Sequence, residues 1–199
     1  MYWQLVIFRL FLQQLQDAAM HPQFALKIPE LEVSPNKDAC SVTRYRALCI
    51  NTLAPFSTTA KTSPSKWARA GVSITIGETK KVTQYLMKVK NYRTMKGSYK
   101  IPLSDCIECL QDAIDQLHGS LGVLRKLNAR NFYAQMGDIT TWLSAVLTDQ
   151  ETCLDGFENP RGKQAKMVRN RVLRSSYFTS NALALVNKLA ASGLDNTVA

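Results

Sequence analysis

Apolar residues recur every three or four positions over one long stretch of the chain. Between Leu103 and Leu124 the steps are four, three, four, three, four and three residues. This spacing puts them on one stripe of an α-helix, which the sequence predicts to begin after Pro102. A break in the pattern at residues 128–131 predicts a loop. The stripe consists of Leu103, Ile107, Leu110, Ile114, Leu117, Leu121 and Leu124.

Three other segments show the same helical period. The first begins at Ser63 and Pro64, a capping residue followed by proline at the first helical position, and runs to about residue 91. The others cover about 132–156 and 162–193. The predicted core residues of these helices are Trp67, Ala70, Ile74, Val82, Leu86, Val89, Phe132, Met136, Ile139, Leu143, Val146, Val168, Val172, Thr179, Ala182, Leu185 and Leu189.

Four amphipathic helices with mostly short connections predict an all-α fold, an up-down-up-down four-helix bundle over residues 63–193. Residues 37–62 predict a short helical hairpin in front of it, whose second helix should end at Pro55. Residues 1–36 contain three prolines and little periodicity, and we interpret them as a leader or irregular arm. Residues 194–199 are expected to be a tail.

The chain has five cysteines, so at least one has no partner within the chain. In an antiparallel helix pair, residues equally far from the connecting loop lie at the same height. Cys106 and Cys153 are equally far from the centre of loop 128–131, which predicts a disulfide between them. Cys40 and Cys49, one in each of the two short helices, would close the hairpin. Cys109 would remain a free thiol.

Cys106 and Cys109 also form a C-x-x-C motif, which is typical of thiol redox enzymes. The βαβ context of those enzymes is absent, so we do not favour redox chemistry. Paired cysteines indicate an oxidising compartment and hence secretion. The apolar start of the chain, residues 1–12, is an atypical leader because no basic residue precedes it and Arg9 interrupts it. It is too short to predict a membrane span.

Charge is distributed unevenly along the chain, whose net charge is +10. Residues 80–100 and 161–174 are basic and contain no acid. Residues 105–158 hold nine acids and three bases, a net charge of −6. This division does not favour a nucleic-acid partner, whose recognition surface would be basic throughout. A polyanion such as pectin stays possible for the basic stretches, although their surface could equally be only solvated.

No set of catalytic residues is apparent, and we predict a non-enzymatic protein without cofactor or metal. Only two histidines are present, His21 in the irregular arm and His118 beside the predicted core of a helix. Two isolated histidines and cysteines committed to disulfides do not make a zinc site. The sequence also lacks a Gly-rich phosphate loop and the G-x-S-x-G motif of hydrolases.

Several longer segments resemble the plant invertase and pectin methylesterase inhibitor family. The most specific is TWLSAVLTDQETCLDGF, and the resemblance covers about Cys40 to Ala191. The other segments are CSVTRYRALC, SPSKWARAGVSITI, IPLSDCIECLQDAIDQL and SNALALVNKLA. The resemblance implies a four-helix bundle preceded by a helical hairpin, with one disulfide in each unit and a fifth cysteine that is often unpaired.

The resemblance further implies a reversible one-to-one complex in which the bundle covers the substrate cleft of a pectin methylesterase. The branch of the family that inhibits acid invertases carries a Pro-Lys-Phe motif, which is absent here. We therefore favour the pectin methylesterase branch in the plant cell wall, or apoplast. An invertase inhibitor and a detached pro-region of a pectin methylesterase remain as alternatives.

The resemblance also indicates which residues would contact the enzyme. Thr152 matches a family threonine on the enzyme-facing side, and Thr148, Asp149 and Glu151 lie near it in sequence. For the two acids, the competing interpretation is an ordinary solvated helix end.

Overall fold

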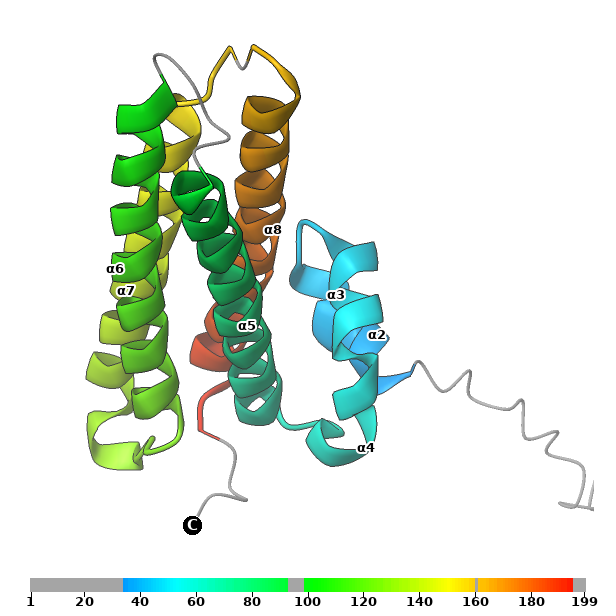
Figure 1. The fold of residues 1–199 in the computed structure, drawn as a ribbon. Helices are drawn as coiled ribbons and strands as arrows, with labels where there is room; N and C mark the ends of the chain where they lie inside the picture. The colour runs from blue at the N-terminus through cyan, green and yellow to red at the C-terminus, as the bar shows by residue number, and fades with distance from the viewer. Residues whose placement is uncertain (1–33, 93–98, 160, 195–199) are drawn as a thin grey trace, which may run out of the picture. The chain divides into compact units, whose positions relative to one another are not determined.

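The computed structural model describes residues 34–92, 99–159 and 161–194. Within these ranges the chain forms only α-helices and short 3-10 helices (Figure 1). The four long helices are α5 (Pro64–Asn91), α6 (Lys100–Leu124), α7 (Phe132–Asp155) and α8 (Lys163–Ser192). The all-α prediction is confirmed. None of the described helices combines the length and apolar character needed to cross a membrane.

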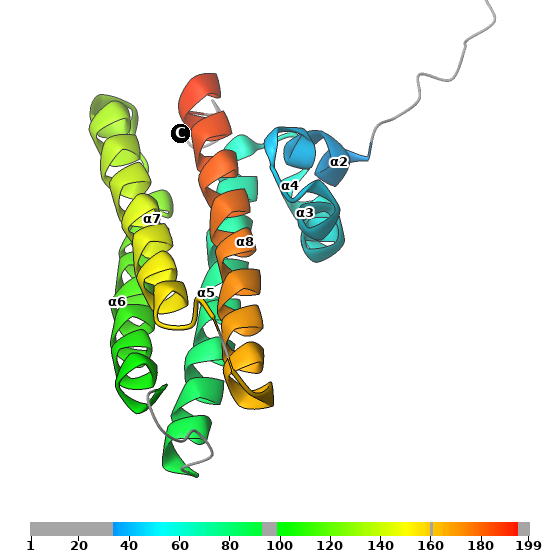
Figure 2. The same ribbon diagram turned by 90° about the horizontal axis from the view of Figure 1, so that it is seen from above.

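The four long helices form an up-down-up-down bundle, as the sequence predicts. Consecutive helices run in opposite directions, and α8 packs against both α5 and α7 (Figures 1 and 2). The predicted stripe of α6 faces the core except at Ile114, which is only half-buried. Ala113 takes that core position and is fully buried, because a straight helix drifts relative to a strict seven-residue repeat.

The ends of the helices follow from local sequence. At the start of α5, the Ser63 hydroxyl accepts a hydrogen bond from the Lys66 amide at 3.4 Å. Helix α6 begins at Lys100 rather than after Pro102, because the first turn does not need the amide hydrogen that proline lacks. Gly193, with a φ of 79°, directly follows α8.

A glycine allows close contact between α5 and α8. A Cβ atom placed on Gly71 would lie 2.9 Å from Cδ1 of Leu185. Gly71 is buried in an α-helix that continues without a break through Gly77. The propensity cost of these glycines in a helix interior is therefore outweighed by tertiary packing.

Residues 35–60 form a separate small helical unit beside the bundle. It contains α2 (Pro35–Ala39), α3 (Arg46–Leu53) and α4 (Ser57–Ala60), with 3-10 helices η1 (Cys40–Val42) and η2 (Ala54–Phe56) between them. Helix α3 ends at Leu53, just before Pro55, but the chain continues through Pro55 as η2 and then as α4. The unit lies on the side of the bundle formed by α5 and α8 (Figure 2).

Polar contacts fasten this small unit to α8. The Asn181 side chain accepts a hydrogen bond from the Tyr45 amide at 3.1 Å and donates one to the Tyr45 carbonyl at 3.0 Å. The rings of Tyr45 and Tyr177 stack with centroids 3.9 Å apart. Lys188 of α8 forms an ion pair with Asp38 of α2 at 2.9 Å.

Two disulfides cross-link the chain. One joins Cys40 to Cys49 inside the small unit, with Cα atoms 5.8 Å apart. The other joins Cys106 of α6 to Cys153 of α7, with Cα atoms 4.4 Å apart. Cys109 is a half-buried free thiol. Almost all of the predicted arm (1–36), with His21, and of the tail (194–199) lies outside the described residues.

Candidate functional site

The last turns of α7 carry the four residues that the sequence analysis singles out. Thr148, Glu151 and Thr152 are exposed and lie on one side of the helix, since positions three and four apart are neighbours on a helix surface. Asp149 differs from them because it is half-buried and turned toward α6. The structure therefore brings three of the four together on an open surface.

The exposed threonines form a ladder of hydroxyl groups along α7. Thr152 donates its hydroxyl hydrogen to the Thr148 carbonyl at 2.9 Å, and Thr148 donates to the Ser144 carbonyl at 3.2 Å. Each hydroxyl hydrogen is thereby used within the helix, and the oxygen lone pairs are directed to solvent. Together with the Glu151 carboxylate, this surface mainly offers acceptors to a partner.

A disulfide at the next residue restricts the position of Thr152. The next residue, Cys153, is buried and covalently joined to Cys106 of α6. Gln150, two residues before Thr152, is completely buried and donates a hydrogen bond to Ser175 of α8 at 3.1 Å. The backbone that presents Thr152 is thus fixed to two neighbouring helices, which lowers the entropy that a partner must remove on binding.

Asp149 is in an environment that disfavours its ionised form. Burial raises the pKa of the Asp149 carboxyl, and the negative charge of Asp112 on α6 raises it further. One of its carboxylate oxygens is buried and has no hydrogen-bond partner within the described part of the chain. Asp149 is therefore more closely associated with the α6–α7 packing than with the open threonine surface.

The same surroundings make Cys109 a poor nucleophile. Burial raises the pKa of its thiol, and the nearby carboxylates Asp149, Asp112 and Asp105 raise it further. Because the thiolate is the reactive form, this thiol stays protonated and inert near neutral pH. The other cysteine of the C-x-x-C motif is bonded to Cys153, so the motif holds no dithiol pair.

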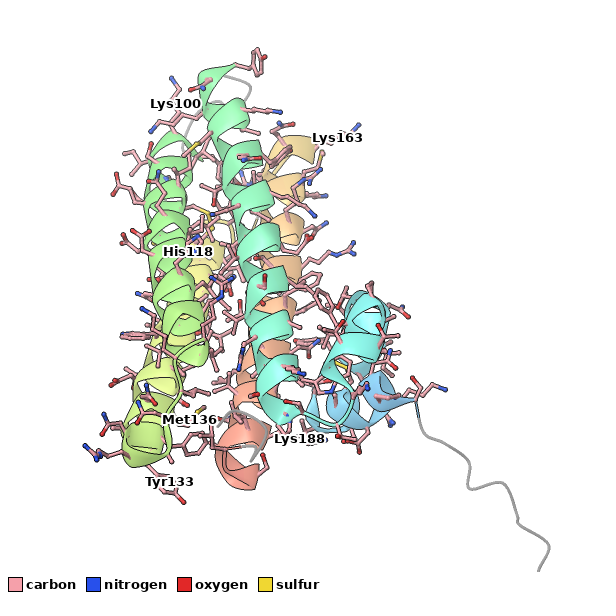
Figure 3. All side chains as sticks on the ribbon, turned by 90° about the horizontal axis from the view of Figure 1, so that it is seen from below. Lys100, His118, Tyr133, Met136, Lys163 and Lys188 are labelled. Atoms are coloured by element: carbon pink, nitrogen blue, oxygen red, sulfur yellow. A yellow bond between two sulfur atoms is a disulfide. The ribbon has the colours of Figure 1, made fainter. Side chains whose placement is uncertain are left out.

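Charge separates onto two sides of the bundle. Exposed acids line α6 next to the threonine surface, namely Asp105, Glu108 and Asp112. Exposed cations follow α5 and α8, which pack together. Lys100 and Lys163 lie at one end of the bundle, opposite Tyr133 and Met136 (Figure 3). The exposed cations of α5 and α8 are Lys66, Lys80, Lys81, Lys88, Lys90, Lys163, Lys166, Arg171 and Arg174.

Within the described residues, no group of three histidine, cysteine, aspartate or glutamate side chains could hold a metal ion. His118 lies exposed on α6.

Sequence reasoning missed the role of Asp112. Its carboxylate influences both Asp149 and Cys109, yet in sequence it looks like an ordinary solvated acid on a helix surface. The contact between Asp112 and Asp149 could have been found with the rule that paired Cys106 with Cys153, namely equal distance from the loop between α6 and α7. Applied to Asp112, it places that residue level with position 147 of α7, about 3 Å along the helix axis from Asp149.

Comparisons with known proteins agree in one family. The profile of the family "Plant invertase/pectin methylesterase inhibitor" matches residues 36–185. The chain is 50% identical over 161 residues to Pectinesterase inhibitor 6 of Arabidopsis thaliana, a match covering 79% of this chain and 76% of that protein. It is 34% identical over 157 residues to Pectinesterase inhibitor 3 of the same plant, covering 76% of this chain and 77% of that protein.

A solved structure shows the same fold. The crystal structure of mutant form A of a pectin methylesterase inhibitor from Arabidopsis superimposes with a TM-score of 0.63. The superposition covers 78% of this chain and 97% of the other, at 18% sequence identity.

Proposed function

The chain belongs to the plant invertase/pectin methylesterase inhibitor family, and on that premise we propose that it inhibits a pectin methylesterase. It does so as a protein partner and not as an enzyme, by forming a reversible one-to-one complex that covers the pectin-binding cleft. The observation that carries the proposal is the 50% identity to a pectinesterase inhibitor along most of the chain.

The geometry of α7 supports a binding role for its last turns. Thr148, Glu151 and Thr152 form a solvent-facing surface on a helix that is cross-linked to α6. A rigid surface loses little conformational entropy on association, so more of its contact energy appears as affinity. Its acceptor groups suit a partner surface rich in backbone amides, lysine and arginine.

The direct test is an inhibition assay of the full chain against a plant pectin methylesterase and, in parallel, a cell-wall acid invertase. We expect inhibition of the esterase that saturates at one inhibitor per enzyme, with the invertase unaffected. Inhibition of the invertase alone would contradict the proposal and assign the chain to the other branch of the family.

Thr152→Asp tests the proposed contact surface. The change places a charge where the interface would exclude water, and such a charge is costly to bury without a partner. We expect inhibition to weaken by about tenfold, or about 1.4 kcal/mol, while the thermal unfolding temperature stays unchanged. Thr58→Asp, at an exposed threonine of α4, is the matched control. Equal potency of the two variants would remove Thr152 from the interface.

We propose secretion to the cell wall as the setting of this function. Structural disulfides are typical of oxidising compartments, and two are present in the described residues. Non-reducing peptide mapping of material recovered from the apoplast should find both pairs. Cys106 linked to Cys109 would contradict this pairing.

A second proposal is that the basic side of the bundle binds de-esterified pectin. Of the exposed cations on α5 and α8, only Lys81 forms an ion pair within the described residues, with Glu78 at 2.7 Å. Unpaired cations can neutralise a polyanion, and such binding weakens with salt. Sedimentation with calcium-pectate gel at about 0.15 M salt tests this. Recovery of all the protein in the supernatant would contradict it.

A further inference from the structure

A pocket lies where the small helical unit meets the bundle. Its volume is about 290 Å³, close to the lower end for small-molecule sites in proteins. Part of its wall comes from η2 and α4, and the rest comes from the start of α5 and the end of α6. The apolar part of the lining consists of Phe56, Ala60, Ala70 and Leu121.

Three cationic side chains, Lys66, Arg69 and Arg125, line the same pocket. Lys66 and Arg69 belong to α5 and Arg125 directly follows α6, yet no acidic residue is among the lining residues. None of the three forms an ion pair with an acid in the part of the chain that the structure describes. Their charges therefore converge on a space with no internal counter-ion.

The charge of Arg69 has no partner within the described part of the chain. Its Nε atom is buried and has no hydrogen-bond partner within the described residues. Nε itself has too little accessible surface for a ligand to reach, so an anion would have to bind the terminal nitrogens of the guanidinium and compensate its charge from there. Since Lys66 and Arg125 are exposed, the pocket is open to solvent at its rim, from which an anion can approach the Arg69 guanidinium.

We propose that this pocket binds a small organic acid, with its carboxylate on Arg69 and its apolar body against Phe56 and Leu121. Guanidinium groups bind carboxylates through two parallel hydrogen bonds, and Lys66 and Arg125 add charge at the rim. The apolar lining favours a flat hydrocarbon or aromatic body over a free inorganic ion. The hydroxyls of Thr59 and Ser73 can hold a polar substituent.

This inference is independent of the proposed inhibition. The pocket includes the last turn of α6, whereas Thr152 lies near the end of α7. Because α6 and α7 are antiparallel, these two positions lie at opposite ends of the helix pair (Figure 1). A ligand in the pocket would instead join α4 to α5, and it would stabilise the packing of the small unit against the bundle.

The experiment is a calorimetric titration of the full chain with trans-cinnamate, and with cinnamamide as its uncharged analogue. We expect one saturable site for cinnamate with a Kd on the order of 1 mM or below, and binding of the amide weaker by about tenfold or more. Amide NMR shifts should change in residues 56–60 and 66–73. Equal binding of acid and amide, or no saturable binding, would overturn the proposal.

Substitutions inside and outside the pocket distinguish binding in the pocket from nonspecific attraction of cinnamate to a positively charged protein. Arg69→Gln should weaken cinnamate binding by about tenfold, because it removes the paired hydrogen bonds. Should Arg69→Gln not fold, Arg125→Gln at the exposed rim is expected to weaken binding measurably.

The control is Lys126→Gln, at the neighbouring exposed cation outside the pocket, which should leave cinnamate binding unchanged. Equal loss in Lys126→Gln and Arg125→Gln would mean that only net charge matters. Inorganic phosphate binding as tightly as cinnamate would contradict the apolar part of the site.

Discussion

Two adjacent residues of α7 are polar and face inward. Asp149 is half-buried against α6, and Gln150 is completely buried against α8. Each has an oxygen that is buried without a hydrogen-bond partner among the described residues. A buried oxygen without a hydrogen-bond partner lowers the free energy of unfolding, so both residues lead to predictions about stability.

The first prediction concerns the pH dependence of folding at Asp149. Because its pKa is raised above the ordinary value of 3.8 in the folded chain, the folded state binds this proton more tightly than the unfolded state. Between the unfolded and folded pKa values, stability contributed by this group therefore falls as pH rises. Above both values, its ionised form disfavours the folded state.

Asp149→Asn should accordingly be more stable than the parent chain at pH 7, with the difference disappearing below about pH 4. Urea unfolding midpoints at both pH values measure this. Asp138→Asn, at an exposed position of the same helix, is the control. A variant that is less stable than the parent chain at neutral pH would show that the carboxylate is satisfied in the folded protein.

The second prediction concerns the buried hydrogen-bond chain from Gln150 through Ser175 to Thr79. Gln150 Nε2 donates to the Ser175 hydroxyl at 3.1 Å, and that hydroxyl lies 3.3 Å from the Thr79 hydroxyl. Gln150→Met removes the unpaired acceptor together with the hydrogen bond to Ser175, and it leaves the Ser175–Thr79 contact in place. We expect it to be neutral or to stabilise by about 1 kcal/mol.

Ser175→Ala should act in the opposite direction. It removes the hydrogen-bond partner that the Gln150 amide has among the described residues, at a cost of about 1–3 kcal/mol. Chemical denaturation of the two variants provides the comparison. Destabilisation of Gln150→Met by as much as Ser175→Ala would mean that the glutamine oxygen does have a partner, such as an internal water.

Among the elements, the small unit of α2, η1, α3, η2 and α4 depends on a few contacts to stay on the bundle. Its own apolar core is extended by Trp67 and Ala70 of α5 and Leu185 of α8. Asn181 adds a side chain that bonds both the amide and the carbonyl of Tyr45. The Tyr45 amide precedes α3 and has no acceptor in that helix, whereas the Tyr45 carbonyl also accepts a hydrogen bond from the Cys49 amide at 3.0 Å.

The third prediction therefore concerns Asn181→Ala. It removes both hydrogen bonds to Tyr45 and should destabilise the docking of residues 35–60 by about 2 kcal/mol. Hydrogen exchange of backbone amides is the measurement, and faster exchange is expected in α3 than in α6. Uniform acceleration across all helices would show instead that the unit and the bundle unfold as one.

At the level of the whole molecule, the two disulfides act on loops of different length. Cys40–Cys49 spans 9 residues and Cys106–Cys153 spans 47. In the chain-entropy description, the longer loop contributes about 4 kcal/mol and the shorter about 2.7 kcal/mol. Only the longer one holds two of the four bundle helices together.

The fourth prediction follows from this difference. Replacing Cys106 and Cys153 by serine should lower the free energy of unfolding by about 4 kcal/mol, and replacing Cys40 and Cys49 by about 2.7 kcal/mol. Thermal unfolding of the two double-serine variants shows which disulfide contributes more to stability. The Cys106 and Cys153 variant should also lose inhibition, because Thr152 no longer has a fixed support. Cys109→Ser, which breaks no bond, is the control. A larger loss from the shorter loop would contradict the entropic account.

Local sequence alone determined the four long helices and the antiparallel order of the bundle. The period of apolar residues is a property of neighbours three and four positions apart, and caps such as Ser63–Pro64 act within one turn. The same rule of equal distance from a loop predicts which cysteines of α6 and α7 meet. The family signature around Thr152 likewise lies in one continuous segment.

Only the tertiary structure decided which side chains meet across long sequence separations. Tyr45 and Asn181 are 136 residues apart, so no local pattern reveals that one satisfies the other. The half-burial of Asp149 depends on how α7 is rotated against α6. The pocket around Arg69 exists only where three separate segments pack together. The physical reason is that hydrophobic period is encoded locally, whereas burial and charge environment arise from contacts between distant segments.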